Sequence, residues 1–231
     1  YQPVKTSVKV FDIKTSSLLW ERNDKEMNLI FPQTLAADGD RVYCKTPEVL
    51  YCLDAATGKN VWTSKIGAPL EKLITKWFWV HKPTPWYWNL QNTSRVMVLK
   101  DRIITFAQKE LYVVSKSDGK VLWKTPCAYA FVSPPNIFPI KDTLYLTSGK
   151  SYRGFDLNTG TSKNTLKTKP TGMGHPRCYR QLSTEKYILS SSAGVEFMDL
   201  KTGRYDINQW TRGNCFAGFI PANGLMYMTP H

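Results

Sequence analysis

Short stretches of alternating apolar and polar residues recur along the chain, each followed by a turn rich in Asp, Thr and Gly. In the clearest stretch, residues 51–62, an apolar strand leads into Asp54, Gly58 follows four residues later, and Trp62 another four residues on. Alternation with period two is typical of a half-buried strand. Asp starts a turn through its side chain, and Gly adopts the positive φ that such a turn needs. The pattern predicts a β-hairpin that ends on a tryptophan.

This hairpin template occurs five times. The turn-starting residues are Asp12, Asp54, Ser115, Asp156 and Asp199. The Gly position holds Ser16, Gly58, Gly119, Gly160 and Gly203, and the Trp position holds Trp20, Trp62, Trp123, Asn164 and Ile207. Successive spacings are 42, 61, 41 and 43 residues, so the period is about 42 with one insertion of about 19. A period of this length is typical of propellers and solenoids.

Two more strands precede each of the last four hairpins. An apolar strand is expected at residues 41–43, 102–106, 143–146 and 186–189, and one further short apolar stretch lies upstream of each. No segment shows helical periodicity. We therefore predict an all-β fold, a β-propeller of four-stranded antiparallel blades with about five blades present.

The Asp-x-x-Thr-Gly-Lys-x-x-Trp sequence of residues 54–62 resembles the repeat of pyrroloquinoline-quinone (PQQ)-like β-propellers. The resemblance covers nearly the whole chain and implies one domain over residues 1–231, a segment of a longer chain, with an aromatic-rich insertion at residues 69–94. It also implies that the repeat tryptophans pack between neighbouring blades. The residues assigned to blade docking are Trp20, Trp62, Trp123, Gly58, Gly119, Gly160 and Gly203.

The last third of the chain resembles uncharacterised exported bacterial proteins with PQQ-like repeats. The segments that carry this resemblance are residues 175–180, 194–200, 212–215 and 221–225. The resemblance implies a periplasmic, outer-membrane-associated or extracellular location, and a chain that continues past His231.

Closure of the propeller has two alternatives. Residues 7–22 are expected to supply the last two strands of a blade, and residues 214–229 the first two. Joined, they would complete a closed five-bladed ring. The resemblance favours the other arrangement, an arc of a seven- or eight-bladed propeller.

Composition excludes several classes of protein. With 42% apolar and 21% charged residues, the chain is not disordered, collagen-like or a coiled coil. Its longest apolar run, residues 127–132, is far shorter than the roughly 20 residues that a transmembrane helix needs. Five cysteines without a C-x-x-C motif argue against a disulfide scaffold, a zinc ribbon and a thioredoxin-type site.

The charge is strongly basic, with 31 Lys and Arg against 18 Asp and Glu, a net +13. Such a charge favours acidic partners such as nucleic acid, anionic lipid or acidic polysaccharide. The lysines are scattered along the chain rather than clustered, which indicates a solvated basic surface.

Quinone catalysis has no sequence support. Enzymes of the resembled family hold PQQ near a disulfide between adjacent cysteines and bind Ca²⁺ through Glu, Asn and Asp, whereas this chain has no Cys-Cys pair and no suitable acidic cluster. It also has only three histidines and no paired carboxylates for acid–base chemistry. We therefore expect no catalytic residues and no required cofactor, with a PQQ–calcium enzyme as the alternative.

His175 and Cys178 form an H-x-x-C motif. Aligning the strands at residues 186–190 and 225–229 brings Cys178 within two positions of Cys215 on neighbouring innermost strands. Three interpretations stay open: a Cys178–Cys215 disulfide, a soft metal site with His175, or two unrelated cysteines.

The insertion is the most unusual stretch because aromatic residues crowd into it. They are Trp77, Trp79, Trp86, Tyr87 and Trp88. Exposed aromatic rings stack on sugars or bases or anchor a protein interface. The structural alternative is that they pack on the propeller.

The sequence therefore predicts an exported, non-catalytic propeller that serves as a scaffold for a protein partner or for a polysaccharide. The alternatives are a PQQ-dependent dehydrogenase, or a fragment of one, and a basic nucleic-acid-binding propeller, whose affinity would fall steeply with salt.

Overall fold

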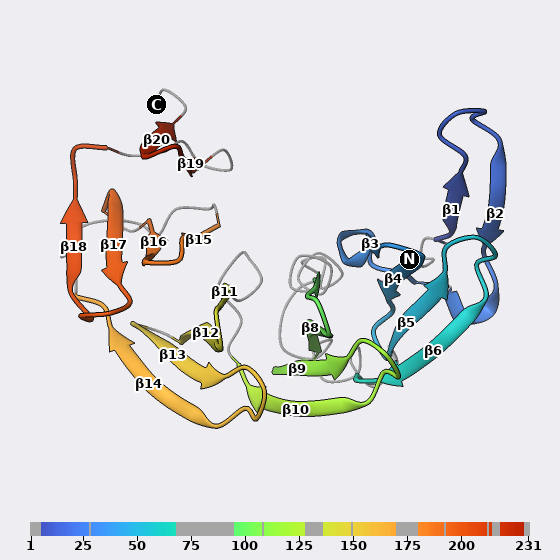
Figure 1. Ribbon diagram of the computed structural model, residues 1–231, viewed down its shortest axis with the longest axis horizontal. Coiled ribbons are helices and arrows are strands. Elements are labelled where there is room, and N and C mark those ends of the chain that lie inside the picture. Colours follow the sequence, from blue (N-terminus) through green and yellow to red (C-terminus); the bar gives the residue numbers. More distant parts are fainter. Residues whose placement is uncertain are drawn as a thin grey trace, which may run out of the picture. The chain divides into compact units, whose positions relative to one another are not determined.

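The computed structural model describes residues 6–27, 29–67, 95–107, 109–127, 136–148, 150–169, 180–191, 193–211, 213 and 218–228. The chain divides into two compact units, Tyr1–Pro126 and Cys127–His231. Both are built from antiparallel strands, coloured along the chain in Figure 1.

The first unit contains ten of the described strands and two single turns of 3₁₀ helix. Its opening hairpin is β1 (Val8–Phe11) with β2 (Leu18–Arg22), followed by η1 (Lys25–Met27) and η2 (Pro32–Thr34). Next comes a sheet of β3 (Ala36–Asp38), β4 (Arg41–Lys45), β5 (Val49–Asp54) and β6 (Asn60–Lys65). The last sheet holds β7 (Val96–Val98), β8 (Arg102–Ala107), β9 (Glu110–Ser115) and β10 (Val121–Pro126).

The second unit repeats the same pattern. One sheet holds β11 (Ile137–Ile140), β12 (Thr143–Ser148), β13 (Ser151–Asp156) and β14 (Ser162–Lys167). The next holds β15 (Leu182–Ser183), β16 (Tyr187–Ser190), β17 (Val195–Asp199) and β18 (Tyr205–Asn208). A two-stranded sheet follows, formed by β19 (Phe219–Ala222) and β20 (Leu225–Met228).

The predicted four-stranded antiparallel sheets are thus confirmed, since four of them occur with strands in chain order. All four strands that were predicted to precede the hairpins are present, as β4, β8, β12 and β16. The strand expected at residues 186–189 begins and ends one residue later. The turns between β2 and β3 are 3₁₀ turns that the alternation of the sequence does not show.

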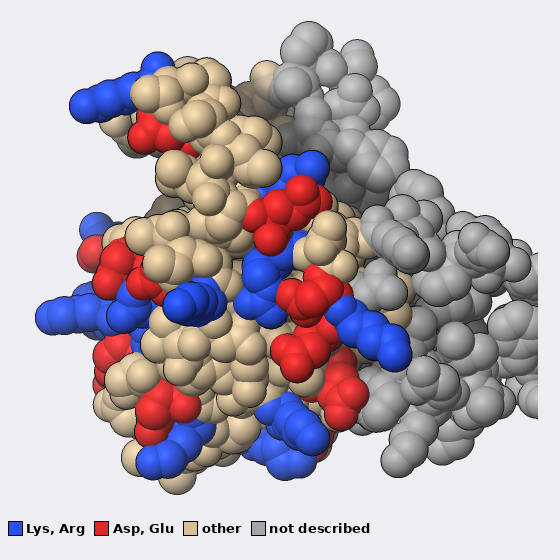
Figure 2. All heavy atoms as spheres, turned by 90° about the vertical axis from the view of Figure 1, so that its right-hand side faces the viewer, with Lys and Arg blue, Asp and Glu red and all other residues tan. Residues whose placement is uncertain are grey.

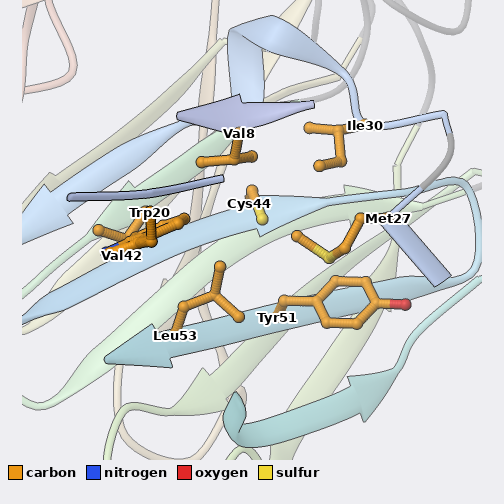
Figure 3. Close-up of a cluster of buried hydrophobic side chains, with 8 residues drawn as sticks. All are labelled: Val8, Trp20, Met27, Ile30, Val42, Cys44, Tyr51 and Leu53. Carbon is orange, nitrogen blue, oxygen red and sulfur yellow. The ribbon is translucent and has the colours of Figure 1, made fainter. Parts of the chain in front are cut away.

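Core packing follows from the alternation of side chains on the two faces of each middle strand. Val42 and Cys44 of β4 and Tyr51 and Leu53 of β5 pack with Val8 and Trp20 on one face, together with Met27 and Ile30 (Figure 3). Tyr43 of β4 and Leu50 and Cys52 of β5 point to the other face. They pack there with Ile103 and Val114 of the following sheet. Both faces of a middle strand are therefore buried, which is what stacking of successive sheets requires. Each fully buried Leu or Ile contributes about 1.5–3 kcal/mol to this stacking.

The second unit packs in the same way. Ile188 and Met198 lie in a cluster with Phe138 and Tyr152 of the preceding sheet. Leu189 and Val195, on the opposite face, pack with Phe219 of the two-stranded sheet that follows.

Candidate functional site

The hairpin turns are built alike in both units. The four template glycines have φ between +70° and +74°, and Ser16 takes their place in the first turn with φ +57°. The N–H of each residue donates to the carbonyl four positions back; in the second turn the Gly58 N–H to Asp54 O distance is 2.8 Å. An L side chain in this region costs about 1–2 kcal/mol, so the predicted glycine preference has a direct backbone cause.

The turn aspartates hold the turns together. Asp54 Oδ1 accepts hydrogen bonds from the Thr57 N–H (2.9 Å) and hydroxyl (2.8 Å), and these bonds lower the pKa of Asp54. Asp12, Asp156 and Asp199 accept the equivalent N–H. In the third turn, where Ser115 replaces Asp, the carboxylate comes from Asp118 instead.

Trp20 and Trp62 each lie on the turn of the next hairpin. The Trp20 indole N–H donates to Ala55 O (2.8 Å), and a Cβ placed on Gly58 would lie 2.7 Å from the Trp20 ring. The Trp62 indole N–H donates to Lys116 O (3.0 Å), and a Cβ on Gly119 would lie 2.5 Å from the Trp62 ring. Gly58 and Gly119 are therefore required for two reasons: the backbone has a positive φ there, and the tryptophan ring leaves no room for a Cβ atom. Trp123 is buried.

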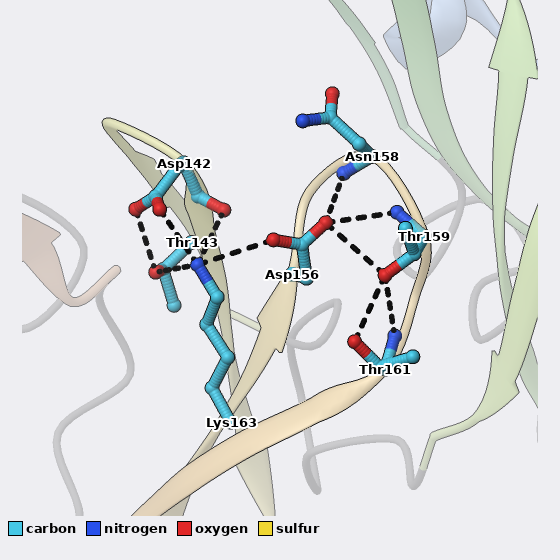
Figure 4. A network of polar contacts seen from close by, with 7 residues as sticks. All are labelled: Asp142, Thr143, Asp156, Asn158, Thr159, Thr161 and Lys163. Carbon is cyan, nitrogen blue, oxygen red and sulfur yellow. Dashed lines mark hydrogen bonds and ion pairs between the residues drawn. The ribbon is translucent and has the colours of Figure 1, made fainter.

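In the second unit, the tryptophan position holds Asn164 in the fourth hairpin and Ile207 in the fifth. A Cβ placed on Gly154 would lie only 2.1 Å from the Asn164 Oδ1, so the Asn164 side chain packs directly against this glycine. Beside it, Lys163 Nζ forms ion pairs with Asp142 (2.7 Å) and Asp156 (3.2 Å), as Figure 4 shows. Gly160 lies in the same turn as Asp156 and has a positive φ. In the next turn, a Cβ placed on Gly203 would lie 3.8 Å from the Leu166 side chain.

A buried polar cluster joins the strands of the next sheet. Glu196, which is fully buried, accepts hydrogen bonds from the backbone N–H groups of Ala193 (2.7 Å) and Gly194 (3.0 Å) and from the Ser190 hydroxyl (3.1 Å). The Ser190 hydroxyl is also 3.1 Å from the Tyr205 hydroxyl. Because the carboxylate binds backbone groups of the turn before β17, the cluster holds that turn.

The outer strands of the first unit expose an apolar residue next to each tryptophan. Leu19 of β2, Val61 of β6 and Leu122 of β10 are 52%, 44% and 48% exposed. At the same template position the second unit has Lys163 and Asp206, both in ion pairs. The fold therefore tolerates a charge at this position and does not require an apolar residue there. We call Leu19, Val61 and Leu122 the outer apolar row.

Other exposed large apolar residues occur on the first and third of these hairpins. The exposed large residues on the same hairpins are Phe11, Ile13, Leu18 and Val121. Sequence reasoning missed the row, although one signal was available: in these three hairpins the residue before the Trp is apolar on an outer strand.

The surface charges are mixed rather than uniformly basic. On the face in Figure 2, blue basic side chains alternate with red acidic ones. Ion pairs among the described residues include Lys9–Glu21 (3.3 Å) and Lys124–Glu110 (2.9 Å). Such a surface fits the solvated basic face that the scattered lysines indicated.

Several predicted site residues lie outside the described part of the chain. They are the aromatic residues Trp77, Trp79, Trp86, Tyr87 and Trp88, and the three candidate metal ligands His175, Cys178 and Cys215. Within the described ranges, no three His, Cys, Asp or Glu residues gather as metal ligands would. Cys44 and Cys52 are buried free thiols, and Cys127 is also buried. No helix among the described residues has the length and apolar character to cross a membrane.

Comparison with known proteins supports the repeat assignment. Residues 4–76 match the PQQ-type family model described as outer membrane protein assembly factor BamB. No curated protein sequence matches the chain.

The fold resembles two solved structures. The crystal structure of BamB from Moraxella catarrhalis superposes with a TM-score of 0.63 at 14% identity, over 96% of this chain and 64% of that one. The computationally designed Ika8 protein superposes with a TM-score of 0.61 at 11% identity, over 94% of this chain and 60% of that one. The chain thus spans less than two thirds of the length of either structure, and identities this low show the fold alone. The family-model match and the fold likeness together confirm the predicted resemblance to the PQQ-like β-propeller repeat proteins.

Proposed function

We propose that this chain is a non-catalytic propeller that binds a protein partner through the outer apolar row of its first unit. The observation that carries the proposal is the contrast between the two units at one template position. Leu19, Val61 and Leu122 are exposed there, whereas Lys163 and Asp206 hold ion pairs. Apolar and aromatic groups are what the centre of a protein interface buries.

We also propose that the protein is exported. The support is that the family model that matches residues 4–76 is described as an outer membrane protein assembly factor. The aromatic insertion would add to the same binding role, toward a protein or a polysaccharide.

One experiment tests the binding proposal. Leu19, Val61 and Leu122 are all changed to Lys, the residue that hairpin four carries at this position, and partners are captured by crosslinking in envelope preparations of the source cells. We expect a specific protein partner to be lost while stability changes by no more than about 0.5 kcal/mol, as is usual for exposed positions.

The matched control adds the same charge to an outer strand that has no apolar row. Thr161, Ser162 and Thr165, all exposed beside β14, are changed to Lys. This control should keep the partner. An identical partner set for both variants and the parent would contradict the proposal, and recovery of the native protein in the cytosolic fraction would contradict export.

A further inference from the structure

The first and last sheets of the chain are two halves of the repeated four-stranded sheet. β1 and β2 carry the hairpin template, so they correspond to the third and fourth strands of a complete sheet, and we call them the first half-sheet. β19 and β20 correspond to the first and second strands, and we call them the last half-sheet. Among the described residues β1 pairs with β2 alone and β20 with β19 alone (blue and red in Figure 1). Each half-sheet therefore lacks the two strands that the other has.

The strand registers determine which residues would face each other in a sheet made from both halves. β20 pairs with β19 in the register in which β4 pairs with β3, so Tyr227 corresponds to Tyr43. β1 and β2 have the register and the bulge of β5 and β6, so Val10 corresponds to Cys52. Because Tyr43 pairs with Cys52, a completed sheet would pair Tyr227 with Val10.

Both half-sheets expose aromatic residues at positions that complete sheets bury. Tyr227 is 51% exposed, whereas its counterparts in the four complete sheets are at most 7% exposed. Phe11, which faces Met226 in the same register, is 55% exposed, whereas its counterparts are at most 3% exposed. The counterparts of Tyr227 are Tyr43, Ile104, Tyr145 and Leu189, and those of Phe11 are Leu53, Val114, Phe155 and Met198. The exposed rings are therefore those that a completed sheet and its neighbours would bury.

The turn of the first hairpin has a matching open contact. In each complete sheet the N–H that follows the turn-starting residue donates to the carbonyl just before the second strand; from Ala55 N to Asp40 O the distance is 2.9 Å. The equivalent N–H of the first hairpin belongs to Ile13, which is 95% exposed, and the equivalent carbonyl of the last half-sheet belongs to Gly224. Joining the half-sheets would bring these two groups together.

The residue at the glycine position of the first turn indicates which hairpin fits before it. Gly58 and Gly119 leave room for the tryptophan ring of the preceding hairpin, but the first turn has Ser16, whose Cβ takes that space. A hairpin that packs before the first one must therefore bring no tryptophan ring. The fifth hairpin, which precedes the last half-sheet, meets this condition, because it has Ile207 at the tryptophan position and Ile207 packs on the core of its own unit.

We propose that the last half-sheet of one molecule and the first half-sheet of a second copy of this chain join head to tail into a complete four-stranded antiparallel sheet. Within the described residues of a single chain both half-sheets stay unpaired, and a copy of the same chain carries the missing strands in matching register. A head-to-tail contact can repeat, so dimers and longer assemblies form. This inference goes beyond the proposed function, because the joining strands β1 and β20 carry no residue of the outer apolar row.

Light scattering after size exclusion tests the association of the whole chain. We expect a molar mass of two or more chains that rises with protein concentration. Tyr227→Lys places a charge where the completed sheet buries the ring, so it should weaken association by about tenfold or more while the melting temperature stays unchanged. Leu122→Lys is the matched control, because Leu122 is similarly exposed (48%) but lies on neither half-sheet. The control should associate as the parent does.

Disulfide trapping tests the register of the joined strands. The variants Phe11→Cys and Met226→Cys, with different affinity tags, are mixed and oxidised. Residues that face each other across paired strands lie within disulfide distance, so we expect a crosslink between the two differently tagged chains. Phe11→Cys mixed with Tyr227→Cys is one residue out of register and should crosslink much less, and the parent chain controls for its own cysteines.

Three outcomes would overturn the inference. The first is a protein that stays monomeric at all concentrations, and the second is equal trapping of the two cysteine pairs. The third is a chain with both Phe11→Cys and Met226→Cys that crosslinks only within itself, because a second copy is then not the occupant. If Leu122→Lys loses association as Tyr227→Lys does, the contact lies on the outer apolar row, so this inference fails while the proposed function stands.

Discussion

At the scale of single residues, the turn glycines and the tryptophans explain why the template recurs. Gly119 has φ +74°, and a Cβ atom on Gly119 would lie 2.5 Å from the Trp62 ring. This position is thus constrained in two ways: locally by the backbone conformation of its turn, and at long range by the tryptophan ring of another hairpin. A residue under two constraints tolerates little change.

We expect Gly119→Ala to lower the free energy of unfolding of the protein by about 2–5 kcal/mol, the sum of the positive-φ cost and overpacking against Trp62. Gly39→Ala is the matched control, because Gly39 has φ +59° but no atom within 4 Å of its Cβ position. The control should cost only about 1–2 kcal/mol. Urea unfolding followed by tryptophan fluorescence measures both, and equal losses would show that the ring contact does not matter.

At the scale of elements, the carboxylate of each turn links two strands into a hairpin. In the fourth hairpin Asp156 accepts the Thr159 and Asn158 N–H groups (both 2.9 Å) and pairs with Lys163, which also reaches Asp142 (Figure 4). These contacts, chiefly the hydrogen bond from the Thr159 backbone, lower the pKa of Asp156 to about 2. The turn is therefore stabilised by an ionised carboxylate.

The pH dependence of this turn follows from the direction of the shift. A carboxyl whose pKa is lower in the folded than in the unfolded state stabilises the fold above its unfolded pKa, here near 3.8, and the contribution is lost as pH falls toward 2. Asp156→Ala should therefore lower Tm by roughly a few degrees at pH 7 and by much less at pH 2. Calorimetry at both pH values checks this. Glu185→Ala, at an exposed carboxyl in the bend between β15 and β16, outside the five template turns, should leave Tm nearly unchanged.

At the scale of the whole molecule, stacking of sheets buries a cation that the repeat pattern does not require. Lys45, at the end of β4, is 1% exposed; its ammonium group donates to Phe106 O on the neighbouring sheet and lies 5.7 Å from the Phe31 ring centre. The equivalent strand positions hold Phe106 and Thr147, as the strand registers show. Loss of hydration lowers the pKa of Lys45 to about 7.

Lys45 should make the stability of the protein rise between pH 7 and about pH 8, below the range in which the raised pKa values of the buried thiols Cys44 and Cys52 act in the opposite direction. In this window the unfolded chain holds a proton on Lys45, with a pKa near 10.5, that the folded chain has released, so raising the pH favours the folded state. One such group contributes up to about 1.4 kcal/mol per pH unit. Lys45→Met should remove this slope and raise stability at pH 7, measured by urea unfolding across the window. An unchanged slope would contradict the assignment, and Lys65→Met should behave as the parent.

The folded elements were largely predictable because their signals are local. Alternation, turn carboxylates and glycines lie within twelve residues of one another, so the strands and four-stranded sheets follow from the chain itself. The candidate site was not predicted. Leu19, Val61 and Leu122 look like ordinary strand residues, and only their exposure sets them apart. Exposure depends on which strand is outermost and on what the next sheet covers, which neighbouring residues do not encode.

The sequence alone thus determined the hairpin, its turn, its period and the all-β class, because backbone conformation and alternation act over a few residues. Tertiary structure decided which apolar residues remain in solvent, which lysine loses its water, and which polar groups close around Glu196. These features arise where sheets distant in sequence meet, since burial is a property of the packed surfaces and not of the residue.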